Sequence, residues 1–237
     1  MSGVFLYFKQ ASFLFFPKKN TSHNGKDLFL KNDDVNIHVI AINEGQKKSI
    51  IYFGGNAETI SDSVDYISEQ FPEYSIYMMN YRSFGLSTGT PSEKGIFSDA
   101  LKVYDYVSKK SKDISIGGRS LGSGVASYVA SKREVRKLAL ITPFNSVQDV
   151  AQDRFKIFPM SILLKNKFKS ESYVKNIKAK TMIFIAEEDT VIPLKYTERL
   201  INKFTAKQLE VITIKGRNHT DISSDEIYFR KMQDFVK

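Results

Sequence analysis

Residues 114–124 read Ile-Ser-Ile-Gly-Gly-Arg-Ser-Leu-Gly-Ser-Gly, a short apolar strand that runs directly into the pattern Gly-x-Ser-x-Gly. The pattern places Gly118 and Gly122 on either side of Ser120, and it is typical of a nucleophile elbow between a strand and a helix. A serine at such a turn adopts strained backbone angles, and side chains at the two flanking positions would collide across it. The same geometry points the N–H of Leu121 to the place where an oxyanion would form. The bare pattern occurs by chance in about one chain of this length in ten, so its meaning depends on partners elsewhere.

The first partner that Ser120 needs is a base. A serine hydroxyl becomes a good nucleophile when a base removes its proton and an acid orients that base. In doubly wound folds with this elbow, the acid and then the histidine follow the serine along the chain. His219 is the one histidine after Ser120, and it lies in a glycine-containing loop beyond the last predicted strand. Since His23 falls in a polar turn and His38 in mid-strand, where a structural role is expected, we predict His219 as the base.

The acid is expected within residues 187–189, Glu-Glu-Asp, which follow an apolar strand at residues 181–186. Asp189 is favoured because the Val-Ile-Pro after it would anchor the loop against the core and hold the carboxylate toward His219. Glu187 and Glu188 stand closer to the end of the strand and are expected to be solvated, and Glu188 is the alternative. We therefore predict Asp189 as the acid.

A second oxyanion donor should be a backbone N–H just beyond an early buried strand. The apolar run at residues 49–53 ends in Gly-Gly-Asn at residues 54–56, and glycine permits close approach of the backbone to a substrate. We predict the N–H of Asn56 as this donor, paired with that of Leu121. A dinucleotide-binding loop is excluded because neither this stretch nor the elbow fits Gly-x-Gly-x-x-Gly, and a P-loop is excluded because Ser123 stands where lysine is required.

Strand-like apolar runs alternate with helical patterns along most of the chain. This alternation predicts an α/β fold with a mostly parallel central sheet and helices on both faces, and the early strands are expected to form an antiparallel edge. Strands are expected at residues 35–42, 49–53, 75–80, 114–117, 135–142, 181–186 and 209–214, and helices at residues 58–70, 92–110, 121–132, 195–204 and 225–236.

Residues 143–177 break this rhythm with an apolar, partly helical segment between two strands. Insertions at the carboxyl end of a sheet are common sites of substrate pockets, so we predict a small helical cap here, against the plainer reading of ordinary core helices. At this length one domain covering residues 1–237 is expected.

Composition limits the classes of function. The chain has 237 residues and no cysteine, which excludes disulfides, cysteine-ligated metals and thiol catalysis. The three histidines show no spacing typical of metal ligands, so no metal is expected. The formal net charge is +9, but the basic residues are dispersed, which argues against a nucleic-acid partner and leaves weak contact with an anionic membrane open.

The aromatic N-terminus, residues 4–16, is too short for a membrane span and lacks the features of a secretory signal. We expect strands or an aromatic flap on the core there, with contact to a membrane interface as the alternative. A cytoplasmic protein is the expectation.

Several ordered motifs together resemble the α/β-hydrolase superfamily. They are Tyr-Phe-Gly-Gly-Asn-Ala at residues 52–57, Asn-Tyr-Arg-Ser-Phe-Gly-Leu-Ser at residues 80–87, the elbow, and the acid and histidine loops. Within the superfamily the chain is similar to small single-domain serine hydrolases, which include palmitoyl-protein thioesterase-like abhydrolase proteins and bacterial relatives. The resemblance covers most of the chain from about Phe13, and it implies an α/β-hydrolase fold.

Two departures from these relatives bear on function. Relatives usually carry His-Gly where this chain has Gly54-Gly55, and many carry a membrane anchor or an acylated N-terminal segment. A role in depalmitoylation of membrane proteins is therefore not carried over. Arg82, in the second motif, is expected to brace its loop by pairing with a carboxylate or with carbonyls rather than to bind substrate.

The leading hypothesis is a serine hydrolase that cleaves carboxylic esters or acyl thioesters through an acyl-enzyme, without cofactor or metal. Ser120 would attack, His219 would act as base, Asp189 would hold the imidazolium, and the N–H groups of Leu121 and Asn56 would stabilise the oxyanion. The partner is then a small-molecule or acylated substrate. A prolyl-oligopeptidase-like peptidase or amidase and a non-catalytic binding protein on the same fold are the alternatives, and the oligomeric state is not addressed by the sequence.

Overall fold

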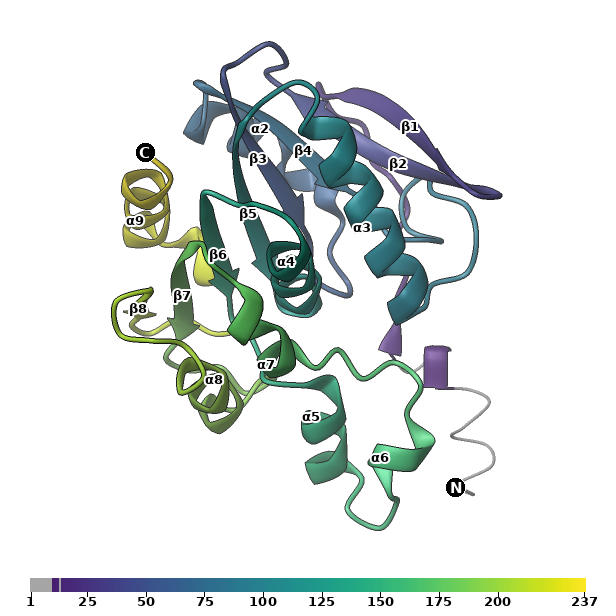
Figure 1. The fold of residues 1–237 in the computed structure, drawn as a ribbon, viewed down its shortest axis with the longest axis vertical. Helices are drawn as coiled ribbons and strands as arrows, with labels where there is room; N and C mark the ends of the chain where they lie inside the picture. The colour runs from purple at the N-terminus through teal and green to yellow at the C-terminus, as the bar shows by residue number, and fades with distance from the viewer. Residues whose placement is uncertain (1–9, 13) are drawn as a thin grey trace.

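The computed structural model describes residues 10–12 and 14–237, and its centre is an eight-stranded sheet in the order β1-β2-β4-β3-β5-β6-β7-β8 (Figure 1). β2 pairs antiparallel with both β1 and β4, and every other pairing is parallel. The strands are β1 (Lys26–Asn32), β2 (Val35–Ile42), β3 (Lys48–Phe53), β4 (Tyr74–Met79), β5 (Asp113–Arg119), β6 (Lys137–Ile141), β7 (Lys180–Ala186) and β8 (Leu209–Ile214).

Helices cover both faces of the sheet, as the alternation in the sequence predicted (Figure 1). α3, α4 and α8 bury Val103, Val125 and Leu200 against one face, and α2 and α9 bury Val64 and Val236 against the other. The helical elements are η1 (Ile60–Ser63), α2 (Val64–Gln70), α3 (Glu93–Val107), α4 (Leu121–Lys132), α5 (Val147–Arg154), α6 (Met160–Leu163), α7 (Ser170–Tyr173), η2 (Val174–Asn176), α8 (Leu194–Ile201), η3 (Ile222–Ser224) and α9 (Glu226–Val236).

The predicted strands and the expected antiparallel edge are confirmed, but one strand was missed. β1 pairs with β2 along its full length, from Lys26 opposite Ala41 to Asn32 opposite Val35. β1 is an edge strand whose residues are all exposed or half-buried, and its apolar run is only Leu28 to Leu30, with polar and charged residues on both sides. An edge strand of this kind becomes visible only when its partner is placed beside it.

The first predicted helix, residues 58–70, begins later than expected. A 3-10 turn, η1, precedes α2, and the backbone does not become helical until Ile60. Before that point the carboxylate of Glu58 accepts the N–H of Gly55 at 2.7 Å, which holds the chain in a loop after β3. The side chain that opens the predicted helix therefore serves the preceding turn.

Residues 143–177 stand beyond the carboxyl ends of the strands (Figure 1). The segment contains α5, α6, α7 and η2, and no residue of α5 is buried. α7, in contrast, packs beside α4 with Ser170 fully buried. The segment is thus anchored at its second half and projects from the sheet through α5 and α6.

The carboxyl ends of the parallel strands gather the predicted site at one edge of the sheet. Residues 54–56 follow β3, Ser120 follows β5, Asp189 follows β7 and His219 follows β8. Parallel strands all end at the same edge, so four loops far apart in the sequence meet there.

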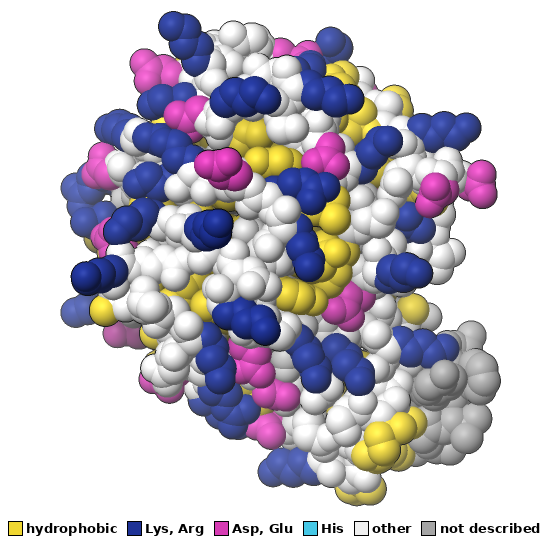
Figure 2. All heavy atoms as spheres, in the orientation of Figure 1, with side chains coloured by type: hydrophobic (Ala, Val, Ile, Leu, Met, Phe, Trp, Pro, Cys, Tyr) yellow, Lys and Arg dark blue, Asp and Glu magenta, His cyan; other side chains and the backbone are white. Residues whose placement is uncertain are grey.

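Charged side chains are dispersed on the face shown in Figure 2, where lysine and arginine alternate with acidic residues instead of forming one block. Within the part of the chain that the structure describes, none of the helices combines the length and apolar character that a bilayer-spanning segment requires. Of the aromatic N-terminus, residues 1–9 and 13 lie outside the described residues, so the expectation of strands or a flap there is untested for them.

Candidate active site

Ser120 forms the sharp turn that the elbow motif predicted. Its backbone angles, φ 50° and ψ −117°, are strained for a non-glycine residue, and α4 begins at the next residue. A Cβ on Gly118 would lie 2.3 Å from the carbonyl oxygen of Gly122, and a Cβ on Gly122 would lie 2.0 Å from that of Phe53. Any side chain at Gly118 or Gly122 would collide with the neighbouring backbone, as the sequence indicated.

The structure brings Ser120, His219 and Asp189 into one hydrogen-bonded chain. His219 Nε2 lies 2.9 Å from Ser120 Oγ, and His219 Nδ1 lies 2.7 Å from Asp189 Oδ2. The other carboxylate oxygen of Asp189 accepts the backbone N–H groups of Val191 and Ile192 at 2.9 and 2.8 Å. These two N–H groups fix the carboxylate, so its free oxygen is directed to the imidazole.

Glu187 and Glu188, the competing acids, make other contacts. Glu187 Oε2 accepts the N–H of Gly216 at 2.9 Å, and the backbone of Glu188 donates to the carbonyl of Arg217. Both interactions join the acid loop to the loop that carries His219. Of the three neighbouring acids, Asp189 is the one whose carboxylate reaches the imidazole.

Two backbone N–H groups of residues that line the same cavity as Ser120 have no protein acceptor among the described residues. Among the residues that the structure describes, no hydrogen bond is made by the N–H of Leu121 or of Asn56. The N–H of Gly55, in contrast, is used by Glu58. A Cβ on Gly55 would lie 3.8 Å from that of Ser120, so this loop passes directly beside the serine. The pair predicted as oxyanion donors is thus left available.

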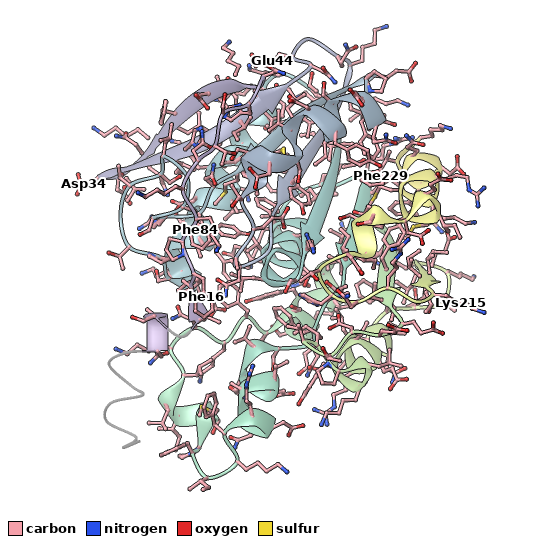
Figure 3. All side chains as sticks on the ribbon, turned by 180° about the vertical axis from the view of Figure 1, so that it is seen from behind. Phe16, Asp34, Glu44, Phe84, Lys215 and Phe229 are labelled. Carbon is pink, nitrogen blue, oxygen red and sulfur yellow. The ribbon has the colours of Figure 1, made fainter. Side chains whose placement is uncertain are left out.

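A cavity of about 450 Å³ opens over these groups. Phe16 lies at the cavity between the sheet and the α5–α6 segment (Figure 3). The lining of the cavity is largely apolar and comes from several segments that are distant in sequence. The lining residues are Leu14, Phe16, Gly55, Asn56, Ala57, Glu58, Arg119, Ser120, Leu121, Phe144, Val147, Val150, Val191, Ile192, His219 and Thr220. An apolar cavity with a few convergent polar groups is the usual form of a small-molecule site.

His23, Asp27 and His38 also meet, although their sequence spacing indicated no metal ligands. One ligand atom of each lies within 4.8 Å of the others. Asp27 Oδ1 contacts His38 Nε2 at 2.7 Å and His23 Nε2 at 3.2 Å. The N–H of Leu86 points at His38 Nδ1, which makes this nitrogen the acceptor and leaves the proton on Nε2, facing Asp27. The nitrogen nearest the carboxylate then has no lone pair for a metal, and the cluster is explained as a brace between β1 and β2.

Arg82 braces its loop, as the sequence predicted. Its guanidinium contacts Asp99 through two hydrogen bonds, of 2.7 and 2.9 Å, and Asp99 is fully buried. Hydrogen bonding to this carboxylate raises the pKa of Arg82. Arg82 does not line the cavity over Ser120.

Two residues of the site were not identified from the sequence. Glu58 and Arg119 both line the cavity, and their side chains contact the loops on either side of Ser120. Arg119 stands inside the elbow motif at its variable position, and the one local signal for Glu58 is its place three residues after Gly55.

Comparison with solved structures supports the fold. An esterase of Pyrococcus furiosus, Pf2001, superposes with a TM-score of 0.76 at 18% identity, over 94% of this chain and 96% of its own. Est1E of Butyrivibrio proteoclasticus superposes with a TM-score of 0.70 at 14% identity, over 90% of this chain and 98% of its own. The architecture is that of the α/β-hydrolases, which confirms the fold that the motifs implied.

Comparison with protein families identifies the family of the chain. Residues 42–220 match the family described as serine hydrolase (FSH1), and the chain belongs to this family. Among curated proteins, lysophosphatidylserine lipase ABHD12 of Bos taurus is 31% identical over 182 residues, 65% of this chain and 44% of the relative. An uncharacterized protein of Mycobacterium tuberculosis is 28% identical over 151 residues, 62% of this chain and 53% of the relative. The chain thus spans about half the length of the curated relatives it matches.

Proposed function

We propose that this chain hydrolyses carboxylic esters or acyl thioesters through an acyl-enzyme on Ser120. The observation that carries the proposal is the hydrogen-bonded chain from Ser120 through His219 to Asp189, which opens into a largely apolar cavity of about 450 Å³. Membership of the serine hydrolase family agrees with it.

In the proposed mechanism, His219 Nε2 takes the proton of Ser120 as the serine oxygen attacks the acyl carbonyl carbon. Asp189 accepts the Nδ1–H and stabilises the imidazolium. The N–H groups of Leu121 and Asn56 bind the tetrahedral oxyanion, where preorganised donors are most effective. The imidazolium then returns its proton to the leaving alcohol or thiol. A water molecule, deprotonated by His219, cleaves the acyl-enzyme, and Ser120 is regenerated with the carboxylic acid as product.

The substrate class follows from the lining of the cavity. Apolar side chains of α5, Val147 and Val150, line the cavity together with Val191 and Ile192 of the acid loop. These walls suit an apolar acyl group, and residues 143–177 would act as a cap that limits its length. A relative named as a lysophosphatidylserine lipase also agrees with an acyl ester of a lipid as substrate, although it extends well beyond the matched region.

We further propose weak contact with anionic membranes through the α5–α6 connection. Ile157 and Ile162 are 92% and 76% exposed there, next to exposed Arg154 and Lys156, in a chain of net charge +9. Exposed apolar side chains beside basic ones suit the headgroup layer of an anionic bilayer. Such contact would bring the cavity close to lipid.

Labelling with a fluorophosphonate tests the catalytic proposal. We expect the wild-type chain to be labelled, and Ser120→Ala to lose labelling and about 10⁶-fold in kcat on p-nitrophenyl esters. Ser127→Ala, which removes another buried serine of α4, is the matched control and should be labelled normally. A folded wild-type chain that takes no label would refute the proposal.

A panel of p-nitrophenyl esters of increasing acyl length, acyl-CoA thioesters and aminoacyl amides tests the substrate class. We expect turnover of esters or thioesters and little of the amides. A preference for the amides would identify a peptidase or amidase instead.

A further inference from the structure

Glu58 accepts two hydrogen bonds and forms one ion pair at the edge of the cavity. Its Oε2 accepts the N–H of Gly55 at 2.7 Å, and its Oε1 accepts the hydroxyl of Tyr52 at 2.9 Å. The guanidinium of Arg119 lies 3.6 Å from Oε2. With two hydrogen bonds and one ion pair at its two oxygens, Glu58 fixes the backbone just before Asn56, the predicted oxyanion donor.

Arg119 extends this contact to the other side of Ser120. Its Nη2 donates to the carbonyl oxygens of both His219 and Thr220 at 3.0 Å. Arg119 also precedes Ser120 directly in the chain, at the end of β5. One guanidinium therefore touches the loop that carries the base and, through Glu58, the loop that carries the oxyanion donor.

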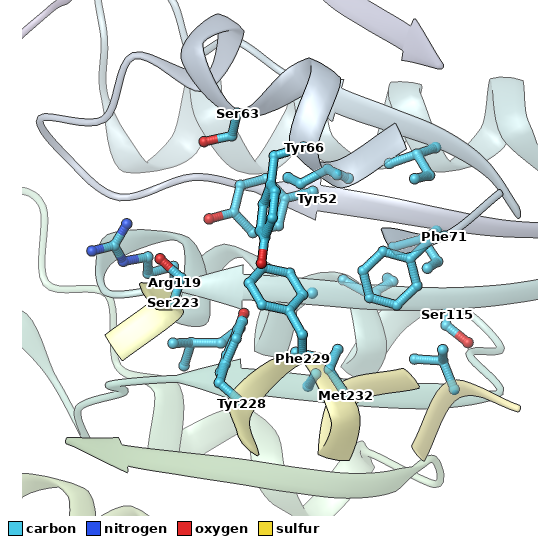
Figure 4. A pocket seen from close by; sticks show the side chains of 18 of the residues that line it. Tyr52, Ser63, Tyr66, Phe71, Ser115, Arg119, Ser223, Tyr228, Phe229 and Met232 are labelled. Carbon is cyan, nitrogen blue, oxygen red and sulfur yellow. The ribbon is translucent and has the colours of Figure 1, made fainter. Parts of the chain in front are cut away.

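The pair is mostly buried, between the cavity over Ser120 and a second cavity behind it. The side chains of Glu58 and Arg119 are 13% and 18% exposed. Behind them, on the face of the sheet covered by α2 and α9, lies a second, smaller cavity of about 110 Å³ that they also line (Figure 4). Its walls include the rings of Tyr52, Tyr228 and Phe229, and beside such apolar groups the attraction between the two charges is screened less than at the surface.

Tyr52 completes the unit from inside the sheet. Burial raises the pKa of Tyr52 well above its ordinary value, with the charge of Glu58 acting in the same direction. The phenol therefore keeps its proton, and its O–H donates the hydrogen bond to Oε1 of Glu58. This contact leaves Oε2 of Glu58 directed to Gly55 and Arg119.

We infer that Glu58 and Arg119 form one positioning unit, which holds residues 54–56 and the loop at His219 in register across Ser120. The inference rests on the proposed function, since it assigns these side chains a part in the same reaction. Neither residue transfers a proton or bonds to the acyl group. Their effect is on the place of the Asn56 N–H and of the imidazole, which must both be set within a fraction of an ångström for the transition state.

Steady-state kinetics on a short p-nitrophenyl ester tests the unit with conservative variants. Glu58→Gln keeps an acceptor for Gly55 and removes the charge that faces Arg119, and Arg119→Lys keeps the charge but loses the fork that reaches two carbonyls. We expect kcat to fall about 10-fold in each, and about 10²-fold in Glu58→Ala, which is comparable to the loss of one oxyanion donor. KM should stay within about threefold of wild type, because ground-state binding uses the apolar walls.

Two variants control for the chemistry of the substitutions. Glu44→Gln alters a carboxylate that accepts Lys26 and Lys110 at 3.0 and 2.7 Å, far from Phe16 and the cavity (Figure 3). Arg133→Lys alters a guanidinium held by Asp105 at 2.7 and 2.9 Å. Both should leave kcat unchanged. A loss of kcat as large in these controls would assign the effect to general destabilisation and overturn the inference.

The double variant Glu58→Gln/Arg119→Lys tests whether the two residues act as a unit. We expect its kcat to lie within about threefold of the worse single variant, because residues that act together are not additive. Fully multiplicative losses would show two independent effects and overturn the inference, as would single variants with wild-type kcat. These results differ from failure of the proposed function, in which the wild-type chain would itself show no turnover and no fluorophosphonate label.

Discussion

The molecule contains two histidine–aspartate pairs of the same length, and they have different surroundings. His219 lies 2.7 Å from Asp189, and His38 lies 2.7 Å from Asp27. The second ring nitrogen of His219 faces the hydroxyl of Ser120 beside a cavity, whereas that of His38 faces the side-chain amide of Asn80 in the closed interior. A histidine–aspartate pair alone therefore does not define a reactive site. The two pairs differ in the group on the second ring nitrogen, which is the Ser120 hydroxyl beside a cavity in one pair and the buried Asn80 amide in the other.

The same substitution at both histidines gives the largest expected contrast. His219→Gln should lower kcat on p-nitrophenyl esters by about 10⁶-fold, since it removes the proposed base. His38→Gln should keep kcat within about twofold of wild type, because its pair lies outside the cavity. If both variants fold and lose kcat to a similar extent, the proposal that only the His219–Asp189 pair is catalytic would be refuted.

The two aspartates provide a smaller contrast of the same kind. Asp189→Asn should lower kcat by about 10⁴-fold, because the amide no longer holds the Nδ1–H tautomer that the reaction uses. Asp27→Asn, measured in parallel, should be nearly silent in kcat. If Asp189→Asn retained most of its activity, another carboxylate such as Glu188 would have to be considered as the acid.

Stability should show the reverse order of effects. His38 is fully buried between Asp27 and Asn80, and Ala at this position leaves both partners without their hydrogen bond. We expect His38→Ala to reduce the free energy of unfolding by about 2–3 kcal/mol in urea. His219→Ala should cost less than about 1 kcal/mol, since residues placed for function are seldom placed for stability. Equal losses would mean that both pairs are structural.

The dependence of stability on pH is the smallest expected effect. Burial lowers the pKa of His38 below its ordinary value, with Asp27 acting in the opposite direction. The unfolded chain then binds the proton more readily than the folded chain, so stability present above about pH 6.5 declines as the pH falls further. Urea unfolding of wild type and His38→Gln between pH 8 and pH 5 measures this dependence, and the free energy of unfolding should decline less steeply in the variant. A steeper decline in the variant would contradict this assignment.

Contact with membranes is tested separately from these pairs. Flotation with vesicles that contain anionic lipid should recover the wild-type chain at low salt and less of it at high salt. Ile157→Ser/Ile162→Ser should reduce recovery while activity on a soluble ester stays the same, and Val211→Ser on β8 is the matched control. Absence of salt-sensitive binding would refute the proposed contact.

Much of the site was predictable because its signals are local. The elbow needs small residues at fixed offsets from Ser120, and the order of serine, acid and histidine follows from the order of the strands. The single histidine after Ser120 left no competitor. Asp189 was preferred because the residues that follow it were expected to anchor the loop against the core. Ile192 is buried as expected but Val191 is 52% exposed, and the N–H groups of both residues hold the carboxylate.

The sequence by itself determined the alternation of strands and helices, the turn at Ser120 and the candidates for its partners, because each is encoded by residues close together in the chain. Only the tertiary structure decided which distant groups meet. It paired Asp27 with His38 through an edge strand whose apolar run is only three residues long, and it joined Glu58, after β3, to Arg119 at the end of the neighbouring β5. Such contacts depend on the order and register of strands, and a sheet brings together side chains whose separation in the sequence carries no signal of their contact.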